Sequence, residues 1–314
     1  MTSATSVTSN GNKAPVVLSV QPRSDFVETP AIHDHTERVL GFLNAGFPVH
    51  FRGPAGSGKT TLAMHVAARL GRPVMLITGD EEFTTSDLIG TQSGYRYRKV
   101  VDQFIHTVLK YEEDASHQWV EHRLTTACRQ GFTLVYDEFT RARPEANNVL
   151  LGVLEEQLLI LPSTSRDDAY IRVHPEFRAI FTSNPREYAG VHNAQDALID
   201  RLVTFDVDYP EEETEIAITV AQSGLGARDA GRIVAIVRAL RALAADGQTL
   251  TVRTSIVIAR VSALQGLRPS AKNQRFVQIC LDVLAAKIAV PEMSAEQRRE
   301  QRTMLEELIE RYCA

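Results

Sequence analysis

The clearest chemistry in the chain lies in GPAGSGKT, the octapeptide at residues 53–60. Its glycines let the backbone curl so that several N–H groups point at one anion, and a helix that begins there adds the positive end of its dipole. The octapeptide fits the pattern G-x-x-x-x-G-K-[ST], in which Lys59 reaches the β- and γ-phosphates of a nucleotide and the Thr60 hydroxyl binds Mg²⁺. The predicted nucleotide contacts are Gly53, Pro54, Ala55, Gly56, Ser57, Gly58, Lys59, Thr60 and Thr61.

An acidic pair, Asp137 and Glu138, ends an apolar run that begins at Phe132. We predict that Asp137 holds Mg²⁺ together with Thr60, and that Glu138 orients and deprotonates an attacking water. A kinase has no need of a water-activating carboxylate at this place, so the pair favours hydrolysis. The alternative is a pair of surface acids after a core strand.

Three polar residues further along the chain are candidates for the same site. Asn184 follows the strand-like run 177–183, where an amide could contact the γ-phosphate or the water; the alternative is an ordinary turn. Arg201 ends a helical stretch and is predicted to reach the γ-phosphate of a neighbouring subunit, or else to cap the helix. Arg253 opens a later helix, where it could sense the nucleotide or be a solvated charge.

The order of apolar runs predicts an α/β fold. Strand-like runs alternate with helical ones, which favours a mainly parallel sheet. The predicted strands are 48–52, 73–78, 132–138, 177–183 and 202–209. The spacing of apolar residues over 146–154 predicts a buried helix, and 158–162 with 169–173 read as a hairpin.

After Pro210 the strand signal fades and the chain reads as helical. The predicted helices are near 211–223, 228–245, 253–266, 271–290 and 293–312. We therefore predict a disordered tail over 1–24, a nucleotide-binding α/β domain over 25–210 and a helical lid domain over 211–314. The fold is expected to be a P-loop αβα sandwich with a five-stranded sheet.

Composition limits the partners and the compartment. The net charge of −5 argues against a chain-wide basic surface for nucleic acid. No apolar run approaches the ~20 residues of a membrane-spanning helix, and no secretory signal is recognisable. The three cysteines are widely spaced without metal-site spacing, which favours a reducing compartment. We expect a cytoplasmic protein that binds neither membrane nor nucleic acid.

The order of these parts resembles the AAA+ ATPases. The stretches DEFTRARPEANNVLLGVLEE and HPEFRAIFTSNP are similar to the MoxR group of that superfamily. A denser likeness, over about residues 26–265, is to the GvpN family of gas vesicle proteins. It is carried by stretches such as FVETP, AGFPVHFRGPAGSGKTTLA, DEFTTSDLIG, KVVDQFIHTVLK and VHPEFRAIFTSNPREYAGVHNAQDALIDRL.

The resemblance implies a Mg²⁺-dependent ATPase that forms a homo-oligomeric ring, expected to be a hexamer. It implies a role in forming gas vesicles, by remodelling or chaperoning shell or accessory proteins, in the cytoplasm or in association with the vesicles. One alternative is a MoxR-type activase of a metabolic enzyme, such as rubisco or nitric oxide reductase. Another is a structural component that binds ATP and seldom hydrolyses it.

A basic and aromatic stretch follows DLIG, where the MoxR group carries an insert. In a ring, such an insert faces the central pore, and alternating aromatic and cationic residues could grip a polypeptide or an acidic partner. The alternative is a solvated hairpin. The candidate contacts are Tyr95, Arg96, Tyr97, Arg98 and Lys99.

Overall fold

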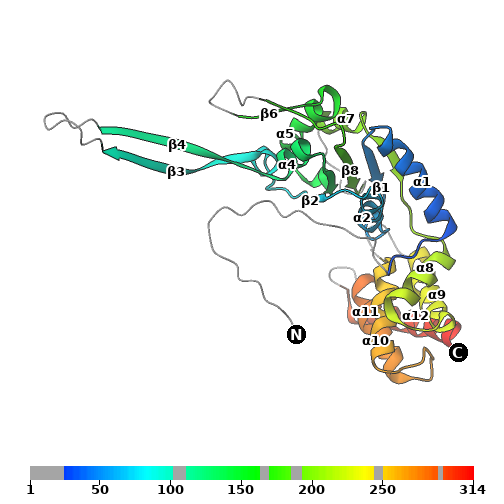
Figure 1. Cartoon of the computed structure of the whole chain (residues 1–314). Coiled ribbons are helices and arrows are strands. Elements are labelled where there is room, and N and C mark those ends of the chain that lie inside the picture. Colours follow the sequence, from blue (N-terminus) through cyan, green and yellow to red (C-terminus); the bar gives the residue numbers. More distant parts are fainter. Residues whose placement is uncertain (1–24, 102–110, 163–169, 185–192, 244–249, 289–292) are drawn as a thin grey trace, which may run out of the picture.

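The computed structural model describes residues 25–101, 111–162, 170–184, 193–243, 250–288 and 293–314. The predicted tail 1–24 lies outside them. Figure 1 shows an α/β body that carries a long two-stranded arm on one side and a helical bundle below. Within the described part of the chain, no helix is long and apolar enough to cross a membrane.

The centre of the body is a five-stranded sheet in the order β2-β5-β8-β1-β9, and all neighbouring strands are parallel. This confirms the predicted sheet. Its strands are β1 (Val49–Arg52), β2 (Val74–Thr78), β5 (Thr133–Asp137), β8 (Arg178–Ser183) and β9 (Val203–Asp206). Both faces of β5 and β8 are buried, as is usual for parallel strands covered by helices.

Strand β9 ends earlier than the predicted range 202–209. The reason is a close approach to the phosphate loop: a Cβ at Gly53 would lie 2.0 Å from the backbone oxygen of Val207. The Tyr209 hydroxyl then donates to the backbone oxygen of Ala55 at 3.2 Å. The chain after Asp206 therefore leaves the sheet and passes along the loop.

Each face of the sheet has its own apolar core, because alternate residues of a strand point to opposite faces. Val135 and Ile180 belong to the core under α1 (Pro30–Asn44) and α2 (Lys59–Arg69). The neighbouring Leu134, Tyr136, Ala179 and Phe181 belong to the opposite core. The helices of that second core include α3 (Thr85–Ile89), α4 (Arg123–Gln130) and α7 (Asn193–Ile199).

The predicted helix over 146–154 is helical throughout, because Asn148 and Gly152 at its junctions keep right-handed helical dihedral angles, but its type changes along its length. It consists of α5 (Pro144–Asn147), α6 (Val149–Leu151) and a π-helical turn, η2 (Gly152–Glu156), and a 3-10 turn, η1 (Phe139–Arg141), precedes it. The side chain of Asn147 donates to the backbone oxygen of Phe139 and accepts from the Tyr136 hydroxyl, both at 3.0 Å. These bonds tie the segment to the end of β5, although the apolar residues Ala146, Leu150 and Val153 are buried as predicted.

Two hairpins extend from the body. The arm in Figure 1 consists of β3 (Gly90–Val101) and β4 (Tyr111–Glu121), which pair with each other as a two-stranded antiparallel sheet. The predicted basic and aromatic stretch 95–99 lies in β3. The predicted second hairpin is confirmed as β6 (Leu158–Ile160) and β7 (Tyr170–Arg172).

The C-terminal part is helical, as predicted. Its helices are α8 (Glu212–Ser223), α9 (Ala227–Leu243), α10 (Val252–Leu264), α11 (Gln274–Ile288) and α12 (Ala295–Cys313). A separate apolar core joins α9, α10 and α11, and α12 packs on it through Leu305, Leu308 and Ile309. The lid therefore has its own core.

Candidate nucleotide site

The phosphate loop requires glycine at each of its three glycine positions for a different reason. A Cβ at Gly53 would meet the backbone of Val207 at 2.0 Å. Gly56 has φ +72°, and a Cβ there would lie 2.5 Å from Cγ2 of Thr251. Gly58 has φ +97° and is the residue from which α2 begins. The loop is thus tightly enclosed by the exit of β9 and by the start of α10.

Lys59 and Ser57 supply donors within the loop. Lys59 is the first residue of α2 and is buried, and its Nζ donates to the backbone oxygen of Pro54 at 2.7 Å. The buried Ser57 hydroxyl has no hydrogen-bond partner among the described residues. A buried ammonium, an unsatisfied hydroxyl and a helix N-terminus at one loop fit a phosphate group.

Thr60 and Asp137 meet at the carboxyl edge of the sheet. The Thr60 hydroxyl donates to Asp137 Oδ1 at 2.7 Å, and the Thr182 hydroxyl donates to the same oxygen at 2.5 Å. A hydroxyl and a carboxylate side by side next to a phosphate loop fit Mg²⁺, which takes oxygen ligands and completes its shell with water and phosphate. The geometry therefore brings together the two residues predicted as metal ligands.

Glu138 follows Asp137 in an unusual backbone conformation, with φ 51°. Its N–H donates to the Thr182 hydroxyl at 2.9 Å, and its carboxylate accepts from Arg141 at 2.7 Å. A non-glycine residue with positive φ is uncommon and often marks a functional site. The half-exposed Glu138 carboxylate directly follows the predicted metal ligand Asp137 at the carboxyl edge of the sheet.

Asn184 directly follows β8, the strand between β5 and β1. It therefore lies at the same edge as Asp137 and the loop, and the backbone N–H of Gly53 donates to Ser183 at 3.3 Å. Deeper in the sheet, His50 lies 2.8 Å from the Ser183 hydroxyl and 3.1 Å from that of Thr204. Burial lowers the pKa of His50 to about 4, so this side chain is neutral at pH 7.

Arg201 lies at the opposite edge of the sheet. Val203, just after it, is paired with Val49 at the start of β1, and the loop begins roughly 13 Å further along that strand. The Arg201 guanidinium is held by Glu155 at 2.6 and 2.8 Å and by the Ala197 backbone oxygen. The structure thus does not bring Arg201 to the phosphate loop of its own chain.

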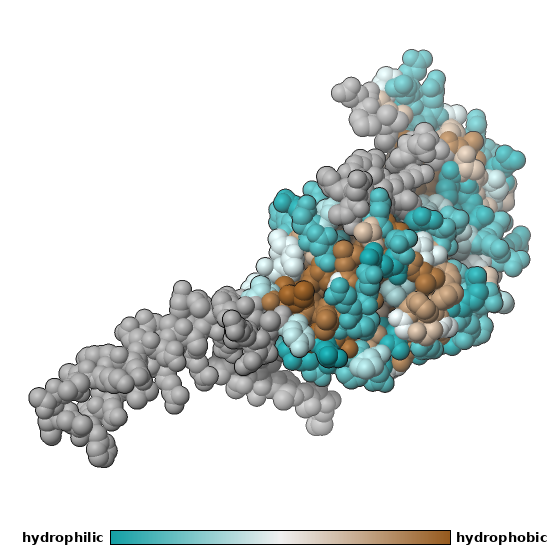
Figure 2. Space-filling model, turned by 90° about the horizontal axis from the view of Figure 1, so that it is seen from above, coloured by the Kyte–Doolittle hydropathy of each residue, from teal (hydrophilic) through white to brown (hydrophobic). Residues whose placement is uncertain are grey.

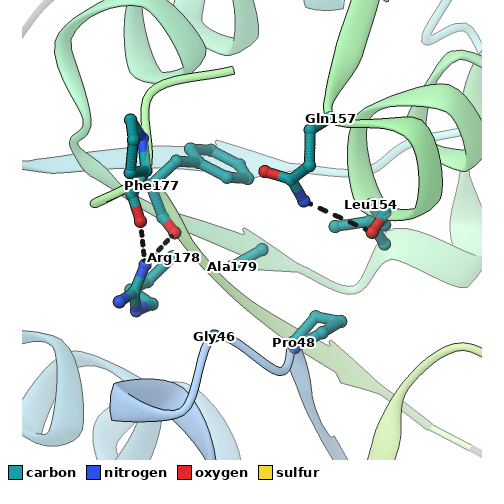
Figure 3. Close-up of a pocket in the computed structure, with 8 residues that line it drawn as sticks. Gly46, Pro48, Leu154, Gln157, Phe177, Arg178 and Ala179 are labelled. Atoms are coloured by element: carbon teal, nitrogen blue, oxygen red, sulfur yellow. Dashed lines mark hydrogen bonds between the residues drawn. The ribbon is translucent and has the colours of Figure 1, made fainter. Parts of the chain in front are cut away.

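A small pocket also lies at this amino edge. Figure 3 shows Phe177 and Gln157 on either side of it, with Gly46 and Pro48 below and Ala179 behind. The Gln157 side chain donates to the backbone oxygen of Leu154 in the pocket wall. None of the predicted site residues lines this pocket.

The lid touches the phosphate loop through the start of α10. Thr251, the residue before α10, packs against Gly56, and Arg253 is exposed two residues later. Tyr209 contacts the loop from the other side, and the Arg241 guanidinium lies 4.4 Å from the centre of its ring. Arg253 thus follows the loop contact at Thr251 by two residues. Residues 95–99 lie on the arm, which points away from α2 in Figure 1.

Three residues of this site were not predicted from the sequence: Thr182, Tyr209 and Thr251. Thr182 stands two residues before Asn184 in the sequence. This closeness to a predicted site residue could have identified Thr182 as a candidate. For Tyr209 and Thr251, the sequence pattern predicts only the end of a strand and the start of a helix. Their contacts with the loop depend on how the lid sits on the body.

The fold and the site define a P-loop ATPase of the AAA+ class. A protein-family model described as "AAA domain (dynein-related subfamily)" matches residues 48–202. The chain belongs to the family of gas vesicle ATPases named GvpN. It is 60% identical to the "Gas vesicle ATPase GvpN" of Ancylobacter aquaticus, over 99% of this chain and 87% of that protein.

Two further relatives show the range of the likeness. The "Gas vesicle ATPase GvpN" of Haloferax mediterranei is 42% identical over 90% of this chain and 80% of that protein. The "Protein NorQ" of Paracoccus denitrificans is 32% identical over 61% of this chain and 62% of that protein. The GvpN likeness therefore extends over much more of the chain, and at higher identity, than the NorQ likeness.

Proposed function

We propose that this protein hydrolyses ATP to ADP and phosphate and that it uses the reaction during gas vesicle formation. The observation that carries the hydrolysis is the grouping of Thr60, Asp137 and Glu138 beside the phosphate loop. Lys59 and the loop amides bind the phosphates, and Arg253 approaches them from the lid. Mg²⁺, held by Thr60 and Asp137, neutralises phosphate charge when bound.

Glu138 performs the step that distinguishes hydrolysis from binding. Its carboxylate accepts a proton from a water that attacks the γ-phosphorus, and the side chain of Asn184 orients that water. The resting ion pair with Arg141 must open or turn for Glu138 to reach the water. The body 25–210 and the lid 211–314 act as two units in this scheme, with the loop between them.

The position of Arg201 supports an oligomeric ring. Because Arg201 lies at the amino edge of the sheet, it can stabilise the transition state only at the site of a neighbouring copy. Phe47 is 56% exposed beside Gly46 and Pro48 of the amino-edge pocket, and Figure 2 shows hydrophobic residues gathered on the face seen from above. Exposed apolar surface of this kind is typical of an interface. We propose a homo-hexamer.

The identity of the client proteins is proposed from the family, and their contact surface from the β3–β4 arm. The names of the relatives connect them to gas vesicles, so the clients are shell or accessory proteins of that compartment. The stretch 95–99 lies on a hairpin that extends far from the body and is available to contact a client (Figure 1). The protein acts in the cytoplasm or on the forming vesicle.

Complementation in the host tests this function. We expect deletion of the gene to leave few or small vesicles, and a copy with Glu138→Gln to fail to restore them in electron micrographs. The double variant Tyr95→Ala with Tyr97→Ala is expected to impair assembly while purified protein keeps its basal ATPase. Normal vesicles in the Glu138→Gln strain would contradict a role for hydrolysis and favour the structural component that binds ATP with little turnover.

The similarity to NorQ supports a second candidate client, a metabolic enzyme that this protein would activate. Both functions share the same chemistry, so an ATPase assay does not separate them. Vesicle yield after deletion does: an activase of a metabolic enzyme would leave vesicles unchanged and lower the activity of that enzyme.

A further inference from the structure

The side chain of Thr182 contacts both acidic residues of the site, the carboxylate of Asp137 and the backbone N–H of Glu138. It is fully buried on β8, between the strand that carries Asp137 and the strand that leads to the phosphate loop. Its hydroxyl donates to Asp137 Oδ1 at 2.5 Å and accepts the backbone N–H of Glu138 at 2.9 Å. One oxygen atom therefore contacts both neighbouring acidic residues.

The hydrogen bond from Thr182 to Asp137 orients the carboxylate that is proposed to bind Mg²⁺. Asp137 Oδ1 accepts hydrogen bonds from Thr60 on one side and from Thr182 on the other. Two donors on the same oxygen restrict the rotation of the Asp137 carboxylate next to Thr60. Ligating carboxylates are usually oriented by such partners, and removal of a partner weakens metal binding roughly 10–100-fold.

The second contact holds a strained backbone. Glu138 has φ 51°, a conformation that costs free energy for a residue with a side chain. The hydrogen bond from its N–H to Thr182 compensates in part, and it fixes the direction in which the Glu138 side chain leaves the strand. Without this acceptor, the Glu138 N–H would lose its partner and the backbone could relax.

We propose that Thr182 is a positioning residue for ATP hydrolysis: its hydroxyl sets Asp137 for Mg²⁺ and Glu138 for water at the same time. This inference rests on the proposed function of the site and adds to it a residue that touches neither nucleotide nor water. Thr182 acts through its neighbours, so its loss raises the Mg²⁺ requirement and lowers turnover together.

The test compares two variants of Thr182 with one control. Thr182→Val keeps the shape and removes the hydroxyl, whereas Thr182→Ser keeps the hydroxyl. The control is Thr133→Val, because Thr133 is also fully buried in the sheet, and its hydroxyl has no partner within the described residues. Binding of ATPγS is measured by calorimetry in EDTA and across a Mg²⁺ series, and ATP turnover is measured in parallel.

For Thr182→Val we expect unchanged ATPγS affinity in EDTA, a roughly 10-fold or larger rise in the Mg²⁺ concentration for half-maximal binding, and roughly 10–100-fold slower turnover. Thr182→Ser should stay close to wild type. The inference is overturned if Thr182→Val matches Thr133→Val, or if Ser and Val variants lose function equally. A wild type that turns over no ATP, with the Mg²⁺ shift still present, would refute the proposed hydrolysis and leave the positioning role intact.

Discussion

The Thr60 hydroxyl donates to Asp137 Oδ1 at 2.7 Å, although the two residues are 77 positions apart in the chain. They meet because the strands before them, β1 and β5, end at the same edge of the sheet with β8 between them. Parallel strands place all their carboxyl ends together, which is where ligands bind in open α/β sheets.

Arg201 is predicted to act in trans. Arg201→Ala should bind ATP normally and hydrolyse it roughly 10³-fold more slowly, because the missing guanidinium no longer stabilises charge at a neighbour's phosphate. A mixture with Lys59→Ala should recover part of the activity at sites that combine an intact Lys59 with an intact Arg201. Arg129→Ala, at an exposed pair with Glu121, is the control. Full activity of Arg201→Ala at a dilution that leaves only monomer would rule the role out.

Two glycines should respond in opposite ways to alanine. Gly53→Ala places a Cβ 2.0 Å from the backbone oxygen of Val207, so the exit of β9 must shift, and both stability and nucleotide binding should fall. Gly41 lies inside α1 with nothing within 4 Å, so Gly41→Ala should stabilise by roughly 0.5–1 kcal/mol through helix propensity. Thermal unfolding with and without ATPγS measures both. Equal melting temperatures for the two variants would contradict the close packing at Gly53.

The lowered pKa of His50 should make the stability of the folded protein depend on pH. Burial lowers its pKa from an ordinary 6.5 to about 4, so between these values the unfolded chain binds a proton that the folded protein does not. Stability should therefore be highest above pH 6.5 and fall as the pH drops towards 4, by roughly 3 kcal/mol from this residue. Urea unfolding at several pH values should show a shallower loss in His50→Asn. The same loss in both proteins would assign it to other groups.

The lid should depend on a buried ion pair. Glu215 is fully buried and accepts from Arg241 at 2.8 Å and from Arg238 at 3.2 Å. Glu215→Ala would leave the two arginines without this partner, and we expect a loss of about 3–5 kcal/mol in urea unfolding. The control is Glu306→Ala, which breaks the exposed pair with Arg302 and should cost less than about 1 kcal/mol. Similar losses for both would show that burial of Glu215 matters little.

The phosphate loop, the acidic pair and the parallel sheet could be predicted because each is a local pattern. The octapeptide 53–60 encodes its conformation in its own glycines, and the strand before Asp137 is mostly apolar. The helices of the lid were likewise predicted from the local sequence after Pro210, where the strand signal fades. Patterns of this kind depend on neighbours in sequence, which are visible without a structure.

Long-range contacts could not be predicted in the same way. Thr182 contacts a residue 45 positions earlier, and Thr251 packs against Gly56 only because the lid sits on the loop. The hydrogen bonds of Asn147 to Tyr136 and Phe139 tie this helical segment to the end of β5, and no apolar periodicity reveals them. The pairing of Arg201 with Glu155 is of the same kind.

The most direct test of the account separates binding from hydrolysis in purified protein. Lys59→Ala should lose ATP affinity, because the charge on the β- and γ-phosphates is gone. Glu138→Gln should bind MgATP like the wild type and release phosphate at a small fraction of its rate, because the phosphate and metal contacts remain while the base is lost. Phosphate release by Glu138→Gln at the wild-type rate would contradict the role given to Glu138.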